Sequence, residues 1–529
     1  MRCRDDLVFG SSRCARALLA GMLTISGILG LAGCGTEPGS PSVQLGNTVV
    51  TGVSEANGIA AFLGLPFAAP PVGELRWGKP QRWQPDGMPI DGTQFAPACM
   101  QTSSGVDWYR GMMARVGIDP NLMVAPEYSE DCLYLNVWTD LEAEAPLPVM
   151  IYIHGGSNTG GWSYEPNYHG EKLAQQGMIV VTVAYRLGVF GWLSHPDMHI
   201  KNPALHDLAA SLAWVHEHIA AFGGDPSRIT IVGESAGADN AIHLAISPLS
   251  QGRATRLIHQ SGGWSFDEDP DTAEAERRGL VLQELLVGEE GSFAALKAIA
   301  AEEILAAVPE VYGGFYFDPV VDPESLPDTL PQLSESGRLP VLEMIIGTNL
   351  NEALMYVPEG ATPDSYFGGR LSQSTIEAIF AELPSDMPLV DQIDRVGTGI
   401  EYLCPSLGLA STVDEVGGRA WVYRFDRVRP GFDAIGAYHG AELPYMFDQH
   451  DAWLPQEDTD QHITRDMVAH WSAFVRAGDP STEAAPAWPQ WRTGVGQMLR
   501  YGDQTLAGAH PDATYCDRLR DHYLSNTNS

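Results

Sequence analysis

The segment RITIVGESAGADNAIHLAIS, residues 228–247, changes at its centre from a strand pattern to a helical one. RITIV is rich in β-branched residues, as buried strands are, and ADNAIHLAIS has apolar residues at helical spacing. Between them, Gly233–Gly237 places Ser235 midway between two glycines. This order predicts a nucleophile elbow, in which the serine hydroxyl is exposed above a sheet and the helix N-terminus faces developing negative charge. The alternative is a structural serine in an ordinary turn.

Elsewhere, apolar runs typical of strands alternate with helical patterns. LPVMIYIHGG, GMIVVTVAYRLG, LPVLEMIIGTN and RAWVYRFDRV have the Val, Ile and aromatic content of strands, and several are continuous enough to be buried on both faces. DLAASLAWVHEHIAAF has helical spacing and is followed by the helix stop GGDP. The alternation predicts an α/β fold with a mostly parallel central sheet flanked by helices. We expect one large domain over residues 45–520 and a polar tail over 521–529.

A serine hydroxyl is a weak nucleophile unless a histidine accepts its proton and an acid holds that histidine in one tautomer. In an α/β-hydrolase fold the acid and then the histidine follow the serine along the chain. A glycine-rich turn after an earlier strand supplies oxyanion donors; VMIYIHGGSNTGG, residues 149–161, fits this role, unless it is simply a tight turn. Residue spacing leaves several downstream candidates open: Glu352, Asp318 and Asp322 as acids, and His439, His450, His462 and His470 as bases.

Longer motifs resemble those of the type-B carboxylesterase/lipase family, which also contains the cholinesterases. FGGDPSRITIVGESAG matches the family's serine signature, and EDCLYLNVW matches its second signature, except that Asp140 replaces the usual closing proline. Further co-linear matches are GLPFAAPPVGELRW, AYRLGVFGWL, HQSG, HGAELPYMF and AFVRAGDPSTEAAPAWP. The resemblance extends from about residue 45 to 520. It implies an α/β-hydrolase fold and a serine ester hydrolase that requires no cofactor.

The resemblance also implies roles for individual residues. Ser235 corresponds to the nucleophile, Glu352 in GTNLNEA to the orienting acid, and His439 in AYHGAEL to the general base. Glu234 and Ser261 resemble polar residues that surround the catalytic triad in the family.

The implied oxyanion hole departs from the family pattern. Its donors would be the backbone N–H groups of Gly156, Ser157 and Ala236. The family usually has glycine or alanine where this chain has Ser157, and an aromatic residue where it has Asn158. A backbone donor survives a serine side chain, so we expect the hole to be intact and the adjoining acyl pocket to be more polar than usual.

Four cysteines lie in the expected domain, and four cysteines allow three connectivities. The resemblance implies a Cys99–Cys132 disulfide, closing a loop with Trp108 and Tyr109 at the rim of the site. It also implies a second disulfide, Cys404–Cys516. Two buried ion pairs are implied as well, Arg76 with Glu130 and Arg186 with Asp207.

The N-terminus has the pattern of a targeting segment. Basic residues precede an uncharged, mostly apolar run that ends in LAGC. LAGC resembles the bacterial lipobox, which implies a lipoprotein-type signal peptide over residues 1–33 and lipidation of Cys34. Residues 34–44 would form a flexible tether. We expect an exported protein anchored in the outer membrane or at the cell surface; the alternatives are a periplasmic or secreted protein and a retained short membrane helix.

The chain is strongly acidic, with 67 Asp and Glu, 31 Lys and Arg, and a formal net charge of −36. Because like charges repel, nucleic acids are poor partners. Histidine and cysteine spacings typical of zinc sites do not occur, so we expect no metal. We therefore predict an esterase for small-molecule esters, held at a membrane only through Cys34. The alternatives are an acyltransferase with the same triad and a non-catalytic binding relative; the sequence carries no signal for an oligomeric state.

Overall fold

The computed structural model describes residues 39–263, 272–510 and 515–519. The predicted signal peptide, Cys34 and the C-terminal tail over residues 521–529 lie outside them. One compact unit begins at Pro41, and its first strand, β1 (Ser42–Leu45), starts inside the predicted tether. Val43 and Leu45 are buried in the core, so the predicted end of the tether at residue 44 is too late. Of the helices in the described ranges, none combines the length and the apolar character needed to cross a bilayer.

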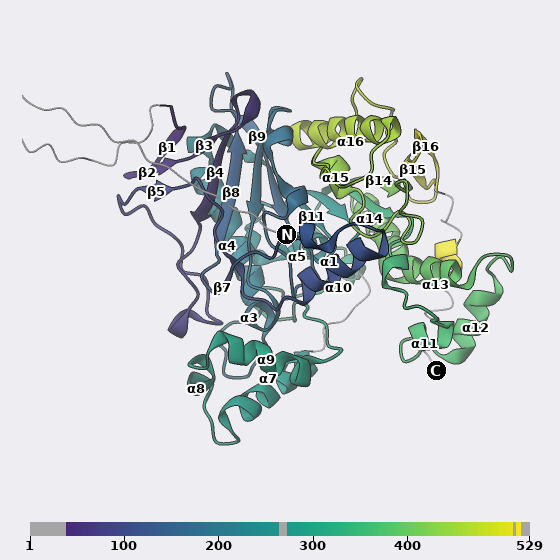
Figure 1. Cartoon of the computed structure of the whole chain (residues 1–529), viewed down its shortest axis with the longest axis horizontal. Coiled ribbons are helices and arrows are strands. Elements are labelled where there is room, and N and C mark those ends of the chain that lie inside the picture. Colours follow the sequence, from purple (N-terminus) through teal and green to yellow (C-terminus); the bar gives the residue numbers. More distant parts are fainter. Residues whose placement is uncertain (1–38, 264–271, 511–514, 520–529) are drawn as a thin grey trace, which may run out of the picture. The chain divides into compact units, whose positions relative to one another are not determined.

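An eleven-stranded mixed sheet forms the centre of this unit, with helices on both of its faces (Figure 1). Its strand order is β16-β15-β14-β13-β12-β11-β9-β10-β8-β4-β3. The pairs from β10 to β15 are parallel, and those at the two ends are antiparallel. This confirms the predicted α/β-hydrolase fold. The strands are β3 (Val53–Ser54), β4 (Ala60–Pro66), β8 (Tyr134–Thr139), β9 (Leu147–Ile153), β10 (Ile179–Val183), β11 (Gly224–Glu234), β12 (Arg256–Gln260), β13 (Glu343–Asn349), β14 (Arg419–Phe425), β15 (Gln497–Tyr501) and β16 (Thr505–Ala509).

The remaining elements are two small sheets and the helices that connect the strands. One small sheet contains β1, β2 (Thr48–Thr51) and β5 (Ile90–Asp91), and the other contains β6 (Ala98–Cys99) and β7 (Tyr128–Ser129). The α-helices are α1 (Ser104–Arg115), α2 (Glu171–Ala174), α3 (Gly188–Trp192), α4 (Pro203–His218), α5 (Ala236–Ile246), α7 (Thr272–Val287), α8 (Phe293–Lys297), α9 (Ala301–Tyr312), α10 (Leu330–Glu335), α11 (Pro363–Phe367), α12 (Gln373–Ala381), α13 (Leu389–Thr398), α14 (Cys404–Glu415), α15 (Leu443–Met446) and α16 (Asp458–Ala477). Short 3₁₀ or π turns are η1 (Ala56–Gly58), η2 (Gly73–Leu75), η3 (Pro120–Leu122), η4 (Pro166–Tyr168), η5 (Ile219–Phe222), η6 (Pro248–Ser250), η7 (Leu354–Tyr356) and η8 (Gly399–Leu403).

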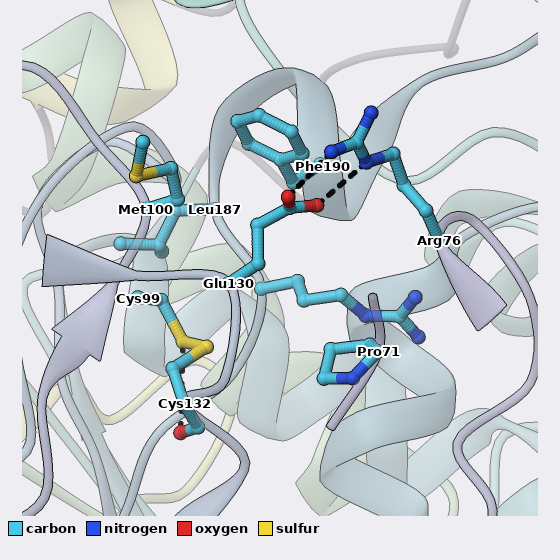
Figure 2. A pocket seen from close by; sticks show the side chains of 9 residues that line it. Pro71, Arg76, Cys99, Met100, Glu130, Cys132, Leu187 and Phe190 are labelled. Atoms are coloured by element: carbon cyan, nitrogen blue, oxygen red, sulfur yellow. Dashed lines mark hydrogen bonds and ion pairs between the residues drawn. A yellow bond between two sulfur atoms is a disulfide. The ribbon is translucent and has the colours of Figure 1, made fainter. Parts of the chain in front are cut away.

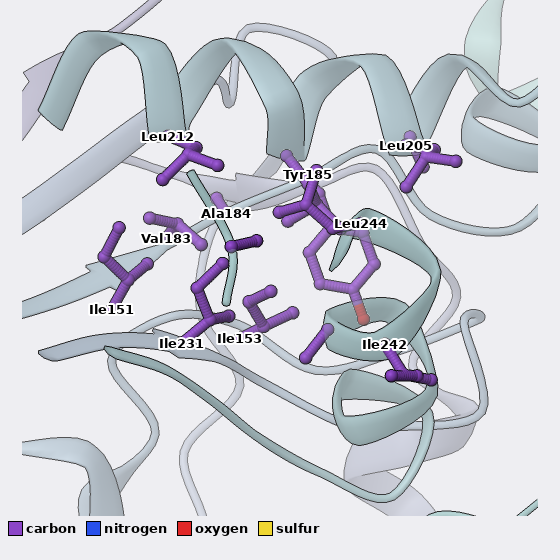
Figure 3. Packing of buried hydrophobic residues seen from close by; sticks show 14 of the residues in the cluster. Ile151, Ile153, Val183, Ala184, Tyr185, Leu205, Leu212, Ile231, Ile242 and Leu244 are labelled. Atoms are coloured by element: carbon purple, nitrogen blue, oxygen red, sulfur yellow. The ribbon is translucent and has the colours of Figure 1, made fainter. Parts of the chain in front are cut away.

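Successive residues of each central strand pack into different cores, because strand side chains alternate between the two faces of a sheet. In β9, Ile151 and Ile153 belong to one core and Met150 and Tyr152 to the other. The first core lies under α4 and α5, whose apolar side chains close over the strands (Figure 3). The second lies under α15 and α16 and contains the fully buried Trp471. Burial on both faces explains why these strands are continuous apolar runs.

Both predicted disulfides, Cys99–Cys132 and Cys404–Cys516, are present. The predicted ion pairs are also present: the buried Arg76 donates two hydrogen bonds, of 2.6 and 2.5 Å, to the partly buried Glu130 carboxylate beside the first disulfide (Figure 2). The space between this pair and that disulfide is only about 10 Å³, room for about one water molecule. Nε of Arg186 lies 2.7 Å from Oδ2 of Asp207. The Cys99–Cys132 disulfide and the Arg76–Glu130 pair hold the ends of the segment that carries α1.

Candidate active site

Ser235 is the single residue between the last residue of β11 and the first residue of α5. Its φ and ψ of 57° and −133° are strained for a residue other than glycine. An added Cβ at Gly233 would lie 2.1 Å from the Gly237 carbonyl oxygen, and one at Gly237 would lie 2.2 Å from the Ile153 carbonyl oxygen. The tight turn therefore requires glycine at both positions, and it leaves Ser235 lining a cavity.

Glu352 and His439 meet above the C-terminal ends of β13 and β14. His439 Nδ1 lies 2.7 Å from Glu352 Oε2, and the other carboxylate oxygen accepts a 2.6 Å hydrogen bond from the Asn349 backbone N–H. Glu352 is fully buried. Its carboxylate can therefore hold the imidazole in the tautomer with hydrogen on Nδ1, which leaves Nε2 free to accept a proton.

Nε2 of His439 lies beside the carboxyl of Glu234. Glu234 Oε1 lies 3.3 Å from Nε2, whereas the Ser235 hydroxyl makes no hydrogen bond within the described ranges. Burial raises the pKa of Glu234 to about 8. Burial alone would lower the pKa of His439, but the negative charges of Glu234 and Glu352 more than offset it, and this pKa is raised. Ser235 and His439 line one cavity, and hydrogen bonds between catalytic groups often form only when substrate binds.

The three predicted oxyanion donors are backbone N–H groups that are not used in the hydrogen bonds of the described fold. Within the described ranges, the backbone N–H groups of Gly156, Ser157 and Ala236 have no hydrogen-bond acceptor. Gly156 and Ser157 line the cavity beside Ser235, and Ala236 N–H belongs to the first residue of α5. Backbone donors next to a nucleophile, with a helix N-terminus behind them, can stabilise a tetrahedral oxyanion.

The cavity has a volume of about 350 Å³ and a largely apolar wall. Helix α1, inside the Cys99–Cys132 loop, contributes Trp108, Tyr109 and Met112 to it, as the sequence predicted for the first two. Glu165, Glu234 and Asp451 also line the cavity, together with the apolar and aromatic side chains of Met355, Tyr356, Phe432, Ile435 and Trp453.

Ser261, predicted to lie near the triad, follows β12 and is fully buried. Its backbone N–H donates to the Gly347 carbonyl oxygen at 2.8 Å, but its hydroxyl has no hydrogen-bond partner in the described ranges. Among the described residues, the Ser261 hydroxyl therefore makes no hydrogen bond to Ser235, Glu352 or His439.

Glu442 is a buried acid that the sequence analysis missed. It accepts hydrogen bonds of 2.9 Å from Gln260 Nε2 and 2.7 Å from Asn349 Nδ2. The Gln260 carbonyl oxygen accepts the Ser235 backbone N–H, and the Asn349 N–H binds Glu352. Glu442 thus connects the elbow to the acid. The available signal was a charged residue three positions after His439, in the otherwise apolar HGAELPYMF.

Glu165 is the second acid that sequence reasoning missed. Glu165 is only 6% exposed, its carboxyl accepts a 3.3 Å hydrogen bond from the Trp162 backbone N–H, and the hydroxyls of Tyr109 and Tyr168 lie beside it. Burial raises the pKa of Glu165 to about 7. Because Tyr109 lies on α1, this carboxyl joins α1 to the segment that follows the oxyanion loop. No sequence pattern indicated this contact.

The described ranges contain no group of three His, Cys, Asp or Glu side chains placed to hold a metal ion. A serine at a strained elbow, a buried carboxylate–histidine pair and free backbone donors around one cavity define a serine hydrolase of the α/β-hydrolase fold.

Comparison with known proteins identifies the family. The model of the carboxylesterase family matches residues 39–518. The chain is 32% identical over 499 residues to para-nitrobenzyl esterase of Bacillus subtilis (strain 168), which covers 89% of this chain and 96% of that protein. It is 30% identical over 488 residues to fumonisin B1 esterase of Sphingopyxis macrogoltabida, which covers 85% and 84%. The chain therefore belongs to the carboxylesterase family and is a serine carboxylic ester hydrolase.

Solved structures agree with this assignment. A thermophilic PNB esterase superimposes with a TM-score of 0.79 at 27% identity, covering 91% of this chain and all of that one. A second PNB esterase gives a TM-score of 0.77 at 28% identity. The predicted family and fold are thus confirmed across nearly the whole chain.

Proposed function

We propose that Ser235 is the nucleophile of this esterase, His439 its general base and Glu352 the acid that orients His439. The observation that carries the proposal is the 2.7 Å contact between Nδ1 of His439 and the fully buried Glu352, together with the fact that His439 and the strained Ser235 line the same cavity. The order of the three residues along the chain, Ser235 first and His439 last, agrees with the α/β-hydrolase pattern.

The chemistry proceeds through an acyl-enzyme. Ser235 Oγ attacks the ester carbonyl carbon while Nε2 of His439 takes the hydroxyl proton. The carbonyl oxygen becomes an oxyanion, which accepts hydrogen bonds from the N–H groups of Gly156, Ser157 and Ala236. The C–O bond to the alcohol then breaks, and His439 gives its proton to the departing oxygen. Water, deprotonated by the same nitrogen, attacks the acyl-enzyme and releases the carboxylic acid and free Ser235.

The substrates are neutral small-molecule esters with an apolar alkyl or aryl part. The cavity wall is mostly apolar, and its ionisable members are Glu165, Glu234 and Asp451 with His439; its described lining includes no lysine or arginine. A wall without a cationic partner disfavours anionic substrates, because an unpaired buried charge is costly. An aromatic alcohol such as that in the name of para-nitrobenzyl esterase suits a wall that contains Trp108.

The enzyme acts outside the cytoplasm, attached to a membrane through lipid on Cys34. The lipobox-like LAGC motif supports this proposal, and so do two disulfides, because disulfides persist in oxidising compartments. Replacing Cys34 by alanine should abolish incorporation of labelled palmitate and move the protein from the membrane to the soluble fraction.

The decisive experiment measures hydrolysis of p-nitrophenyl esters from acetate to palmitate by protein that lacks residues 1–33. Ser235→Ala should lose nearly all turnover while it keeps the melting temperature of the parent protein. The preferred chain length separates a short-chain carboxylesterase from a lipase. Retained turnover in Ser235→Ala would contradict the assignment of Ser235 as the nucleophile. Faster release of nitrophenol when alcohols are added, with transfer of the acyl group to those alcohols, would favour the acyltransferase alternative.

A further inference from the structure

The loop that carries two of the oxyanion donors has an unfavourable backbone. Gly156, Ser157 and Asn158 follow one another with φ values of 103°, 54° and 58°. Side chains disfavour this left-handed region, although asparagine tolerates it better than most residues. A succession of such residues persists only where surrounding contacts hold it in place.

Asn158 provides those contacts and is itself 99% buried. Its Nδ2 donates a 2.8 Å hydrogen bond to the Phe317 carbonyl oxygen, and its Oδ1 accepts a 2.8 Å bond from Asn240 Nδ2. Its backbone carbonyl oxygen accepts a 2.6 Å bond from the Gly188 N–H. Side-chain and main-chain groups of one residue thus fix the loop in three directions.

Asn240 lies on α5, one turn after Ala236, whose N–H is the third oxyanion donor. The Asn158–Asn240 bond therefore joins the loop that carries two donors to the helix that carries the third. Tyr185 holds the chain near the start of the loop, because its hydroxyl donates a 2.9 Å hydrogen bond to the His154 carbonyl oxygen. Figure 3 shows the Tyr185 hydroxyl directed toward α5 from the strand side of the core.

We propose that Asn158 is a positioning residue, whose amide bonds to Asn240 and Phe317 keep the N–H groups of the loop aimed at the same point as Ala236 N–H. An aromatic residue, usual in the family at this position, fills space but cannot make these two directed bonds. The inference rests on the proposed function, because it requires the tetrahedral oxyanion to lie between these donors. Complete loss of one donor typically lowers kcat by about 10²–10³-fold, so misaligning the loop should cost less than that.

The test is Asn158→Ala, with Asn240→Ala as a second variant in case the first does not fold. Both should lower kcat for p-nitrophenyl acetate by about 10-fold or more and leave KM within about threefold. Affinity for a trifluoromethyl ketone, which forms a tetrahedral adduct with serine, should fall by the same factor as kcat. A loss of stability alone would not separate kcat from KM in this way.

Asn202 offers a matched control. It is 98% buried, has a φ of 51°, and its Nδ2 donates a 2.7 Å hydrogen bond to the Val320 carbonyl oxygen, but it does not line the cavity. Asn202→Ala should lower the melting temperature and keep kcat. If Asn158→Ala or Asn240→Ala folds and has the same kcat as the control Asn202→Ala, the inference is overturned. Activity in Ser235→Ala would instead overturn the proposed function, so the two failures are distinguishable.

Discussion

Glu234 Oε1 lies 3.3 Å from Nε2 of His439, the nitrogen that accepts the Ser235 proton in the proposed mechanism. The chain order places Glu234 directly before Ser235, so the elbow that presents the Ser235 side chain also presents this carboxyl. The negative charges of Glu234 and Glu352 together raise the pKa of the imidazole despite its burial. This relationship couples the ionisation of the base to a residue outside the triad.

Glu234→Gln should move the pH–rate profile to lower pH. His439 accepts a proton only when neutral, so kcat/KM rises with pH through the pKa of His439. Removing the charge of Glu234 lowers that pKa, and the midpoint of the rise should shift down by about one pH unit or more. The measurement is kcat/KM for p-nitrophenyl acetate from pH 5 to 10. Glu217→Gln, an exposed acid on α4, serves as the control, and an unchanged midpoint in Glu234→Gln would exclude the coupling.

Glu165→Gln should change how stability depends on pH. Burial raises the pKa of Glu165 from 4.5 to about 7, so the folded chain binds this proton over a range in which the unfolded chain releases it. The wild type therefore loses stability as pH rises from about 4.5 through 7, by on the order of 3 kcal/mol, whereas glutamine does not titrate.

Urea unfolding at pH 4.5 and pH 8 measures this effect. The unfolding free energy of Glu165→Gln minus that of the wild type should become more positive at the higher pH, because only the wild type loses stability as pH rises. The exposed Glu302→Gln on α9 should show no such trend, and parallel curves for Glu165→Gln and wild type would contradict the prediction.

The two disulfides should differ in what their removal changes. Cys404–Cys516 spans 112 residues and Cys99–Cys132 spans 33, so chain entropy predicts losses of about 4–5 and about 3–4 kcal/mol. Only the shorter loop contains α1, which lines the catalytic cavity. Paired Cys→Ser variants should therefore show the larger fall in unfolding free energy for Cys404 and Cys516, and the larger rise in KM for Cys99 and Cys132. If removing either disulfide changes KM equally, the Cys99–Cys132 disulfide does not act on substrate binding through α1.

The sequence predicted the parts of this molecule that depend on local pattern. Continuous apolar runs indicated the central strands, and the glycines beside Ser235 indicated the elbow, because both follow from spacing along the chain. Family motifs then selected Glu352 and His439 among several candidates. Contacts between distant segments were not predictable, because no periodicity encodes them. Asn158 with Asn240 and Glu165 with Tyr109 are of this kind, and the end of the tether was misplaced because a four-residue strand has too short a pattern.

Substrate charge provides the last prediction. The described cavity lining combines three carboxyls, Glu165, Glu234 and Asp451, with no lysine or arginine. An ester that carries its own carboxylate must bury it there without a cationic partner, at a cost of several kcal/mol. We expect kcat/KM for the mono-p-nitrophenyl ester of glutarate to be about 10²-fold or more below that for p-nitrophenyl valerate, with Ser235→Ala as the blank.

Two treatments, added salt and substitution of the cavity acids, show whether the cavity or the acidic surface causes the lower kcat/KM for the anionic ester. Repulsion by the net charge of −36 acts through solvent and should shrink in 0.5 M NaCl, because salt screens exposed charges far more than buried ones. At a pH above the pKa values of Glu165, about 7, and Glu234, about 8, both carboxyls are ionised. There, discrimination by the cavity should persist in salt and fall when Glu165 and Glu234 are both replaced by glutamine. If salt alone removes the difference, the surface repels the anion during encounter and the cavity acids do not select substrates; if neither treatment matters, the glutarate ester binds away from these two carboxyls.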